Sequence, residues 1–455
     1  MARIHSQINF EAILDDLREL VENNQYTFIR NILADLHPAD IADLLEHLDS
    51  DARRKVFAVL PAEKAGEVLA ELDDALKESI LRQMDNRAIA RLVSEMDSDD
   101  AADVVSELST EQAAQVLEEV EKESSEEIQE LLLYPEDTAG GIMAKEYVAI
   151  RADQTVQEAI EELRKQRENV DSFYQCYVVD QFGHLVGTVS LTDLLLADPN
   201  TRIKDIMNSD LISIKSDMDQ EEVARLFQKY DLVSAPVVDE RGRLIGRITI
   251  DDILDVIEEE TDEDLARIAG TGEEEIMEEN IFRISRGRLP WLILSFAGEI
   301  VSAFILDFFS ATIDQIVASA FFIPIVMAMG GSTGQQSAII VVRGLATGEI
   351  SLKDTRRRLW REIRVALISA VVIATLIFSV VTLWQGDPRF AAILAGTLII
   401  VILNASIFGA LIPLLFKKFN IDPALATGPF VATFNDVIGL LIYFSLLSVA
   451  FHYFL

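Results

Sequence analysis

Nine carboxylates fall within the fourteen residues 251–264. Asp252, Asp255 and Glu259 in this run are spaced i, i+3 and i+7, so in a helix they share one face. Like charges on one face repel, so this face requires cations, basic partners or water. Ligand sets made only of oxygen suit hard cations such as Mg²⁺ or Ca²⁺. A solvated acidic linker is the alternative interpretation of the same residues.

Three further carboxylates, Glu299, Asp307 and Asp436, lie within strongly apolar stretches, where charge is costly and therefore a functional candidate. Asp436 follows Gly428-Pro429, and a proline there removes a donor and frees backbone carbonyls. Free carbonyls with one carboxylate can line a cation path. The alternatives are an interfacial Asp307, a structural Glu299 and an Asp436 that is bonded to a neighbouring hydroxyl.

The apolar stretches that hold these acids are long enough to span a bilayer. We expect five spans, at about 290–309, 316–342, 365–384, 391–416 and 428–452. The segment 330–336 (Gly-Gly-Ser-Thr-Gly-Gln-Gln) in the second predicts close helix approach or an unwound turn. Basic residues precede the first stretch and fill the loops after the second and fourth, which predicts a cytosolic N-terminus and an exterior C-terminus.

The charge of the chain is divided unevenly along its length. Residues 283–455 carry 13 basic and 9 acidic residues, so residues 1–282 hold a net charge of −41 within a total of −37. Such an acidic surface is a poor match for nucleic acid and suits cations, although acidity that only aids solubility is the alternative. The single cysteine, Cys176, lies in a strand-like run and is expected to be buried and inert. The N-terminus shows no apolar signal segment, so we expect the acidic part to stay in the cytosol.

A twelve-residue repeat runs through residues 10–130. Apolar residues recur at seven positions in register, and a turn-prone or charged residue follows each: Leu48, Leu60, Leu72, Met84, Met96, Leu108 and Val120. This pattern predicts an α-solenoid of short stacked helices. We expect Ser98 and Ser109 to be N-caps of two of them.

An internal duplication covers residues 137–258. Each copy has an Ile-Met pair, an apolar strand ending in an Asp–x–x–Gly turn, a second strand and a helix that begins near Thr192-Asp193 or Asp251-Asp252. This β-α-β-β-α order resembles a tandem CBS-domain pair. The resemblance implies a regulatory module, often a sensor of adenine nucleotides, and neither copy shows a nucleophile–base pair. We therefore expect no enzyme.

The whole chain resembles the MgtE magnesium channels in its order of segments and in its span motifs, Gly-Gly-Ser-Thr-Gly-Gln-Gln and Asp-Pro-Ala-Leu…Gly-Pro-Phe-Val-Ala-Thr…Asp. Ser332 departs from the family, which usually has Asn there. The resemblance implies a multidomain integral membrane protein. Its parts would be an α-solenoid N-domain at 1–136, α/β CBS domains at 137–200 and 201–260, a connecting helix at 261–284 and a five-helix transmembrane domain at 285–455.

The resemblance also implies a homodimer in the lipid bilayer of the cell membrane, with a pore lined by the second and fifth spans and with Asp436 as its carboxylate. Mg²⁺ would be both the transported and the regulatory ion, and adenine nucleotide is a candidate ligand of the CBS pair. The implied sensor acids are Glu67, Asp99, Asp103, Asp219, Glu221, Asp231, Asp252, Asp255, Glu260, Glu263, Asp264 and Asp422.

Two other functions are compatible with parts of this pattern. A CBS-regulated transporter of Mn²⁺, Co²⁺ or another solute would share the architecture, but an anion path should show Lys or Arg at mid-depth, and the predicted spans have none. A cytosolic sensor merely anchored to the membrane would not need Asp436 beside a helix break.

Overall fold

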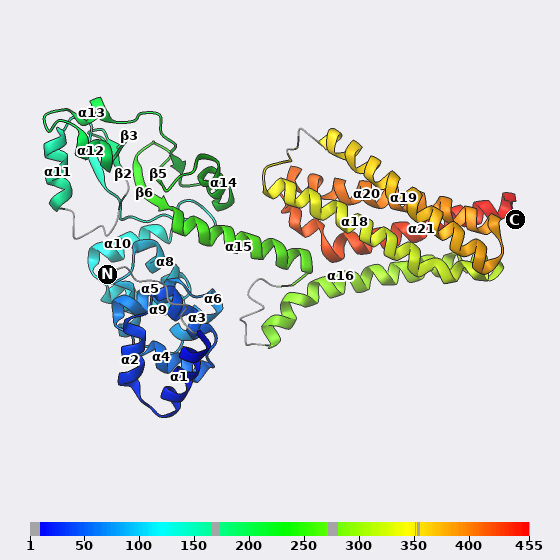
Figure 1. Cartoon of the computed structure of the whole chain (residues 1–455), viewed down its shortest axis with the longest axis horizontal. Helices are drawn as coiled ribbons and strands as arrows, with labels where there is room; N and C mark the ends of the chain where they lie inside the picture. The colour runs from blue at the N-terminus through cyan, green and yellow to red at the C-terminus, as the bar shows by residue number, and fades with distance from the viewer. Residues whose placement is uncertain are drawn as a thin grey trace. The chain divides into compact units, whose positions relative to one another are not determined.

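The structure is a computed structural model that describes residues 10–165, 173, 175–271, 281–350, 352 and 355–454. The chain divides into two compact units, Met1–Glu259 and Glu260–Leu455, and each is described by itself. Figure 1 gives the element labels used below.

Short helices joined by tight turns build the N-terminal part of the first unit. All seven apolar repeat positions are buried or half-buried, which confirms the predicted helical repeat. In the described residues the helices are α1 Phe10–Glu22, α2 Tyr26–Ala34, α3 Pro38–Glu46, α4 Ser50–Phe57, α5 Ala62–Ala70, α6 Asp74–Leu81, α7 Asn86–Val93, α8 Ser98–Ser106, α9 Thr110–Glu119 and α10 Lys122–Leu131.

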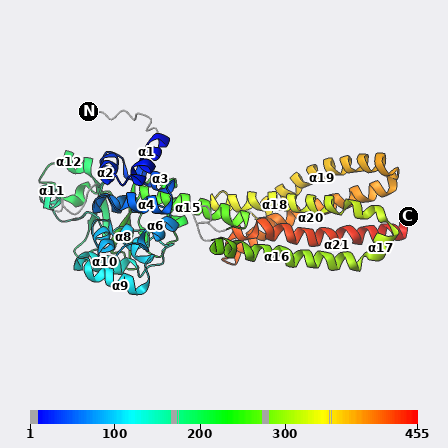
Figure 2. The same ribbon diagram turned by 90° about the horizontal axis from the view of Figure 1, so that it is seen from below.

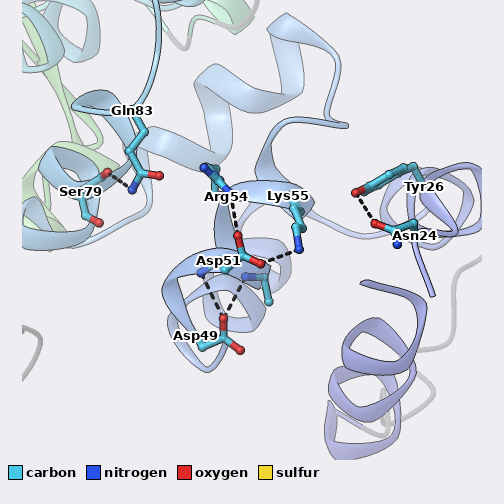
Figure 3. A network of polar contacts seen from close by, with 9 residues as sticks. Asn24, Tyr26, Asp49, Asp51, Arg54, Lys55, Ser79 and Gln83 are labelled. Carbon is cyan, nitrogen blue, oxygen red and sulfur yellow. Dashed lines mark hydrogen bonds and ion pairs between the residues drawn. The ribbon is translucent and has the colours of Figure 1, made fainter. Parts of the chain in front are cut away.

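Many acids of the helical repeat have local structural roles, as Figure 3 shows around α4. Asp49 is the N-cap of α4 and accepts hydrogen bonds from the backbone N–H groups of Asp51 and Ala52 at 3.1 and 3.0 Å. Asp51 pairs with Arg54 and Lys55 at 2.6 and 2.5 Å. Part of the acidity therefore serves capping and i, i+3 or i, i+4 pairing within single helices.

Two small sheets, each with strands in sequence order, form the CBS part of the first unit. Within each sheet the first pair of strands is parallel and the second antiparallel. The elements are β1 Ala149–Arg151, α11 Val156–Lys165, β2 Gln175–Val179, β3 Leu185–Ser190, α12 Leu191–Leu196, α13 Ile203–Ile206, β4 Ile214–Lys215, α14 Gln220–Tyr230, β5 Ser234–Val238, β6 Leu244–Thr249 and α15 Ile250–Ala269.

The Asp–x–x–Gly turns form as predicted. Asp180 accepts hydrogen bonds from two backbone N–H groups of its own turn, at 2.8 and 2.9 Å, and Asp239 does the same in the second repeat, at 2.9 Å in both cases. Gly183 and Gly242 hold φ values of +83° and +78°, which side chains with a Cβ rarely adopt. The same local chemistry therefore closes both hairpins.

The two CBS repeats exchange their Ile-Met segments. Met207 packs on Gly187 of the first repeat, where an added Cβ would lie 2.9 Å from its sulfur. Met143 packs on Gly246 of the second, where the same distance would be 2.6 Å. Each repeat is thus completed by a segment of the other, which explains why a glycine stands at the same place in both.

The second unit holds the last ten residues of α15 and the apolar helices. Five helices are long and apolar enough to span a membrane, which confirms the predicted number of spans within the described residues. Figure 2 shows these helices running side by side. The elements are α16 Ile281–Phe308, α17 Ser310–Gln315, η2 Val317–Phe322, α18 Ile323–Ala346, α19 Thr355–Gln385, α20 Pro388–Lys418, η4 Pro423–Ala426 and α21 Gly428–Phe454.

The first and third spanning helices begin earlier than the apolar pattern predicts, at Ile281 and Thr355. Arginine favours helix, so each helix continues through its basic flank beyond the apolar stretch. Within the predicted connecting segment 261–284, α15 ends at Ala269 and Gly270 takes a left-handed conformation. Residues 272–280 of that segment lie outside the described residues.

The glycine segment 330–336 is helical throughout α18, so the predicted close approach is correct and the unwound turn is not. A Cβ at Gly409 of α20 would overlap the backbone of Gly334, so α18 and α20 touch backbone to backbone. A Cβ at Gly334 would in turn overlap the Asn435 amide of α21. Small residues therefore let three helices meet closely.

Replacing Gly409 by alanine tests this contact. We expect a loss of about 1–3 kcal/mol of stability, because the added methyl group must push α20 away from α18. Gly396→Ala on the same helix is the matched control, since nothing lies within 4 Å of a Cβ there. Thermal unfolding of the detergent-solubilised chain measures both, and equal melting temperatures would contradict the packing.

Candidate functional site

An acidic cluster joins α8 to the start of α15 in the first unit. Asp99 and Asp100 lie half-buried in the first turn of α8, and Asp252 lies half-buried in the first turn of α15. The charge of Asp252 repels the charges of both α8 aspartates. The fold thus brings together acids that are about 150 residues apart in sequence.

Burial and like charge make ionisation of these carboxyls unfavourable. Burial first, and then Asp252 and Asp100, raise the pKa of Asp99 well above its usual range. Burial, and then the charges of Asp103 and Asp252, raise the pKa of Asp100 to about 7. Burial raises the pKa of Asp252 to about 6, although hydrogen bonds from Thr249 oppose the shift. At neutral pH a bound cation would stabilise the charged carboxylates, because its charge would replace the hydration that they have lost.

Lys77 of α6 supplies the basic charge beside this cluster. Surrounding protein atoms raise the pKa of Asp103 to about 7, although its side chain still reaches solvent, and the Lys77 ammonium opposes this shift. Loss of surrounding water, and then Glu71, raise the pKa of Asp255, which Lys77 also opposes. Lys77 Nζ lies 3.3 Å from Asp74 Oδ1, so one ammonium is shared among several acids.

Hydrogen bonds at the helix starts orient Asp252 of the cluster. They also show that two helices begin earlier than predicted. Thr249 is the residue before α15 and donates from its backbone N–H to Asp252 Oδ2 at 2.9 Å. Ser190 and Asp193 form the equivalent box at α12, where Asp193 N donates to Ser190 Oγ at 3.0 Å. Asp193 and Asp252 are therefore third residues of capping boxes rather than N-caps.

Ser98 is not the predicted N-cap, because it is the first residue of α8 and Asp97 precedes it as the cap position. Ser98 instead donates to Glu146 at 2.8 Å through its hydroxyl, which also accepts from the backbone N–H of Lys145 at 2.8 Å. It thereby ties α8 to the segment that enters the first CBS repeat. Ser109 is the N-cap of α9, as predicted.

The acidic cluster supplies oxygen ligands without forming a closed cage. Among the residues that the structure describes, no three Asp, Glu, His or Cys side chains are placed to hold one metal ion. Mg²⁺ sheds its water reluctantly, so such acids suit an ion that keeps part of its hydration shell. The donor set therefore fits a hydrated hard cation.

The other predicted acids of the first unit lie apart from this cluster in the described contacts. Asp219 is the N-cap of α14 and accepts from Glu221 N at 3.0 Å, while the Glu221 carboxylate pairs with Arg225. Asp231 ends α14 with a φ of +51°. Glu67 lies exposed on α5. Ordinary helix-end and surface roles account for these four positions.

Arg267 joins two predicted metal ligands in the second unit. It pairs with Glu263 one turn earlier on α15 and with Asp422, which lies before η4. Asp422 also accepts from Ala424 N at 2.8 Å as the cap of η4. An arginine thus pairs with two acids that the resemblance implies are sensor ligands. The predicted ligands Glu260 and Asp264 lie on the same half of α15.

The end of α15 packs directly on the start of α21. Gly428 begins α21 with a φ of +48°, and a Cβ there would overlap the carbonyl of Ile268. A Cβ at Gly270 would lie 3.1 Å from the Pro429 ring. The predicted helix break at Gly428-Pro429 is present, and Gln335 of α18 donates to the Gly428 carbonyl at 3.4 Å.

Asp436 lies two turns farther along α21, where it faces α18. A Cβ at Gly331 would lie 3.7 Å from Asp436 Oδ1. Glu299 of α16 is close enough for its charge to repel that of Asp436, and Gly298 beside it packs on Thr433 of α21. Among the described residues no Lys or Arg forms an ion pair with Asp436. Within the part of the chain that the structure describes, the carboxylate therefore has no basic partner at a depth where charge is costly.

Several residues of these sites were not identified from the sequence. Arg267 follows Glu263 at i+4, a spacing that could have revealed the pair. Asp100 adjoins Asp99 and could have been grouped with it. Lys77 and Glu146 come from separate elements and had no local signal.

Comparison with known proteins agrees with this arrangement. The MgtE model, described as a divalent cation transporter, matches residues 323–446. The model of the MgtE intracellular N domain matches 36–137, and the CBS model matches 139–200 and 203–259. The magnesium transporter MgtE of Thermus thermophilus is 37% identical over 96% of this chain and 98% of its own length. The chain belongs to the MgtE family.

Two further relatives of the MgtE family support this assignment. The magnesium transporter MgtE of Bacillus subtilis is 37% identical over 71% of this chain and 72% of its own length. A crystal structure of the cytosolic domain of the Mg²⁺ channel MgtE with ATP matches 53% of this chain and 99% of that chain, with 37% identity and a TM-score of 0.51.

Family membership confirms several expectations from the sequence. The MgtE family is one of transporters, so the expectation of no enzyme is confirmed. The chain is a multi-pass membrane protein with cytosolic N-terminal domains.

The raised pKa values predict how the acidic cluster responds to pH. Between the usual aspartate pKa of about 4 and the raised values of about 6 and about 7, the folded chain holds protons that the unfolded chain has lost. The free energy of opening α8 should therefore fall by roughly 2–4 kcal/mol as pH rises through this window, and Mg²⁺ should restore most of it at high pH.

Hydrogen exchange of α8 in the full chain, corrected for intrinsic rates, measures this effect. Asp100→Asn should flatten the pH dependence, whereas Glu118→Gln, an exposed acid of α9, should leave it unchanged. The same slope in Asp100→Asn as in the wild type would contradict the electrostatic origin.

Proposed function

We propose that this chain is a Mg²⁺-selective channel or transporter for magnesium uptake, with Asp436 as the carboxylate of the ion path. The observation that carries the proposal is the Asp436 carboxylate, which faces Gly331 of α18 without a basic partner among the described residues. Its position past the Gly428-Pro429 break, within a domain matched by a divalent cation transporter model, supports this role. A hydrated Mg²⁺ would be held there through its waters.

A homodimer would complete this site, because two chains would contribute one Asp436 each to a shared path. Five spans and the basic loops support an exterior C-terminus for each chain. Mn²⁺ or Co²⁺ is the alternative cargo, because both ions accept oxygen ligands.

We also propose that cytosolic Mg²⁺ closes the path through the acidic groups. At low Mg²⁺ the cluster of Asp99, Asp103, Asp252 and Asp255 repels itself, and bound ions would favour its compact form. The contact of Ile268 with Gly428 would carry the change from α15 to α21. This is a population shift that results from the different ion affinities of two states.

The remaining implied acids would join the sensor in its ion-bound state: Glu67, Asp219, Glu221, Asp231, Glu260, Glu263, Asp264 and Asp422. Glu263 and Asp422 would exchange their shared Arg267 for an ion. We further propose that the CBS pair binds adenine nucleotide, since the cytosolic domain of a relative was crystallised with ATP.

Mg²⁺ flux into liposomes that contain the purified chain tests the path. Asp436→Ala should reduce flux at least about tenfold, because the variant lacks the carboxylate that would accept hydrogen bonds from the waters of the hydrated ion. Asp307→Asn is the matched control, since Asp307 is another acid within a spanning helix and should leave flux near the wild-type level.

Unchanged flux in Asp436→Ala would exclude this residue from the path. Mn²⁺ and Co²⁺ measured in the same liposomes would decide the cargo, and a wild-type preference for either over Mg²⁺ would favour the alternative.

A further inference from the structure

Glu362 is a buried acid that neither the ion path nor the acidic cluster uses. It lies on α19 and is only 6% exposed. Its Oε1 pairs with Arg358 Nη2 one turn earlier at 2.7 Å, and the Arg358 side chain is 13% exposed. A complete ion pair is thus enclosed among the spanning helices.

A chain of hydroxyl groups connects this ion pair to two other helices. Ser337 of α18 donates its single hydroxyl proton to Glu362 Oε2 at 3.2 Å. Ser406 of α20 lies 2.9 Å from Ser337 Oγ, and because that proton is already used, Ser406 must be the donor. Both serines are buried. The Glu362 carboxylate therefore terminates a polar chain through α20, α18 and α19.

Ser337 lies one turn beyond the glycines that face the ion path. Gly334 touches Gly409 of α20 and the Asn435 amide, and Gly331 faces Asp436. Glycines provide close contact but no directional bond that would fix how far α18 slides or rotates. The bond from Ser337 to Glu362 supplies a directional contact from α19, a helix outside the second and fifth spans that would line the ion path.

Stability alone does not explain why the Glu362–Arg358 ion pair is buried here. A buried ion pair contributes little net stability compared with well-packed apolar side chains, whereas its directional bonds can specify register. Apolar clusters that include Ala338 of α18, Ala366 of α19 and Ile402 of α20 already pack in this part of the chain. Register between α18 and its neighbours is what the polar chain adds.

We propose that Glu362 is a positioning residue for the ion path: through Ser337 it sets the register of α18 opposite Asp436 and thereby the selectivity among divalent cations. This inference rests on the proposed function, because it takes Asp436 as the carboxylate of the path. A shift of α18 by a fraction of an ångström alters the space beside Asp436. Hydrated ions of different size fit that space to different degrees, so their relative flux changes.

The test measures the ratio of Mn²⁺ to Mg²⁺ flux and the half-saturating Mg²⁺ concentration in liposomes. Both readouts are independent of how much protein is folded. Glu362→Gln should change the flux ratio about threefold to tenfold, in line with the effect of residues that couple to a site without touching its ligand. Arg361→Gln, which removes the exposed charge next to Glu362, should leave the ratio unchanged.

Ser337→Ala provides a second variant, because it breaks the link to α18 and leaves the ion pair intact. It should change the ratio in the same direction as Glu362→Gln. A wild-type ratio and half-saturation in Ser337→Ala and in any Glu362→Gln that assembles would overturn the proposal, even if total flux fell with protein yield. That result together with a strong loss in Asp436→Ala would reject the role of Glu362 alone. Normal flux in Asp436→Ala would reject the proposed function itself.

Discussion

Carboxylates that are crowded together or held among apolar helices, with few basic groups beside them in the described residues, are the constraint on which this structure depends. The first unit gathers Asp99, Asp100, Asp103 and Asp252 with Lys77 as the nearby cation, and the surrounding protein atoms raise the pKa of each acid. The second unit places Asp436 within a spanning helix, without an ion pair in the described residues. Both arrangements favour the binding of a cation from solution.

Glycines let helices of the second unit approach one another closely. Gly334 and Gly409 join α18 to α20, Gly298 joins α16 to α21, and Gly428 lets α15 reach the start of α21. Directional bonds then fix the register that glycines leave open, as the Glu362 network does for α18. The contact at Gly428 connects a helix rich in acids to the helix that carries Asp436.

Patterns of hydropathy and charge predicted the architecture well, because bilayer spans and helical repeats impose strong periodicity on the sequence. The acids Asp252 and Asp436 could be singled out from spacing and from their apolar surroundings. Lys77 and Glu146 could not, because the fold brings them to the acidic cluster from separate elements. Nothing in the sequence marked Glu362 as a buried acid, because hydropathy placed the start of its span at about 365. In the structure α19 already begins at Thr355, so Glu362 lies within this helix, and its side chain is buried.

The most direct test of this account varies Mg²⁺ on the side of the acidic domains alone. Liposomes with the full chain in one orientation allow tracer Mg²⁺ flux to be measured while Mg²⁺ on that side rises from micromolar to millimolar. The account predicts that flux falls steeply over this range, as bound ions offset the repulsion among the carboxylates and close the path. Flux that does not depend on Mg²⁺ on that side would contradict it.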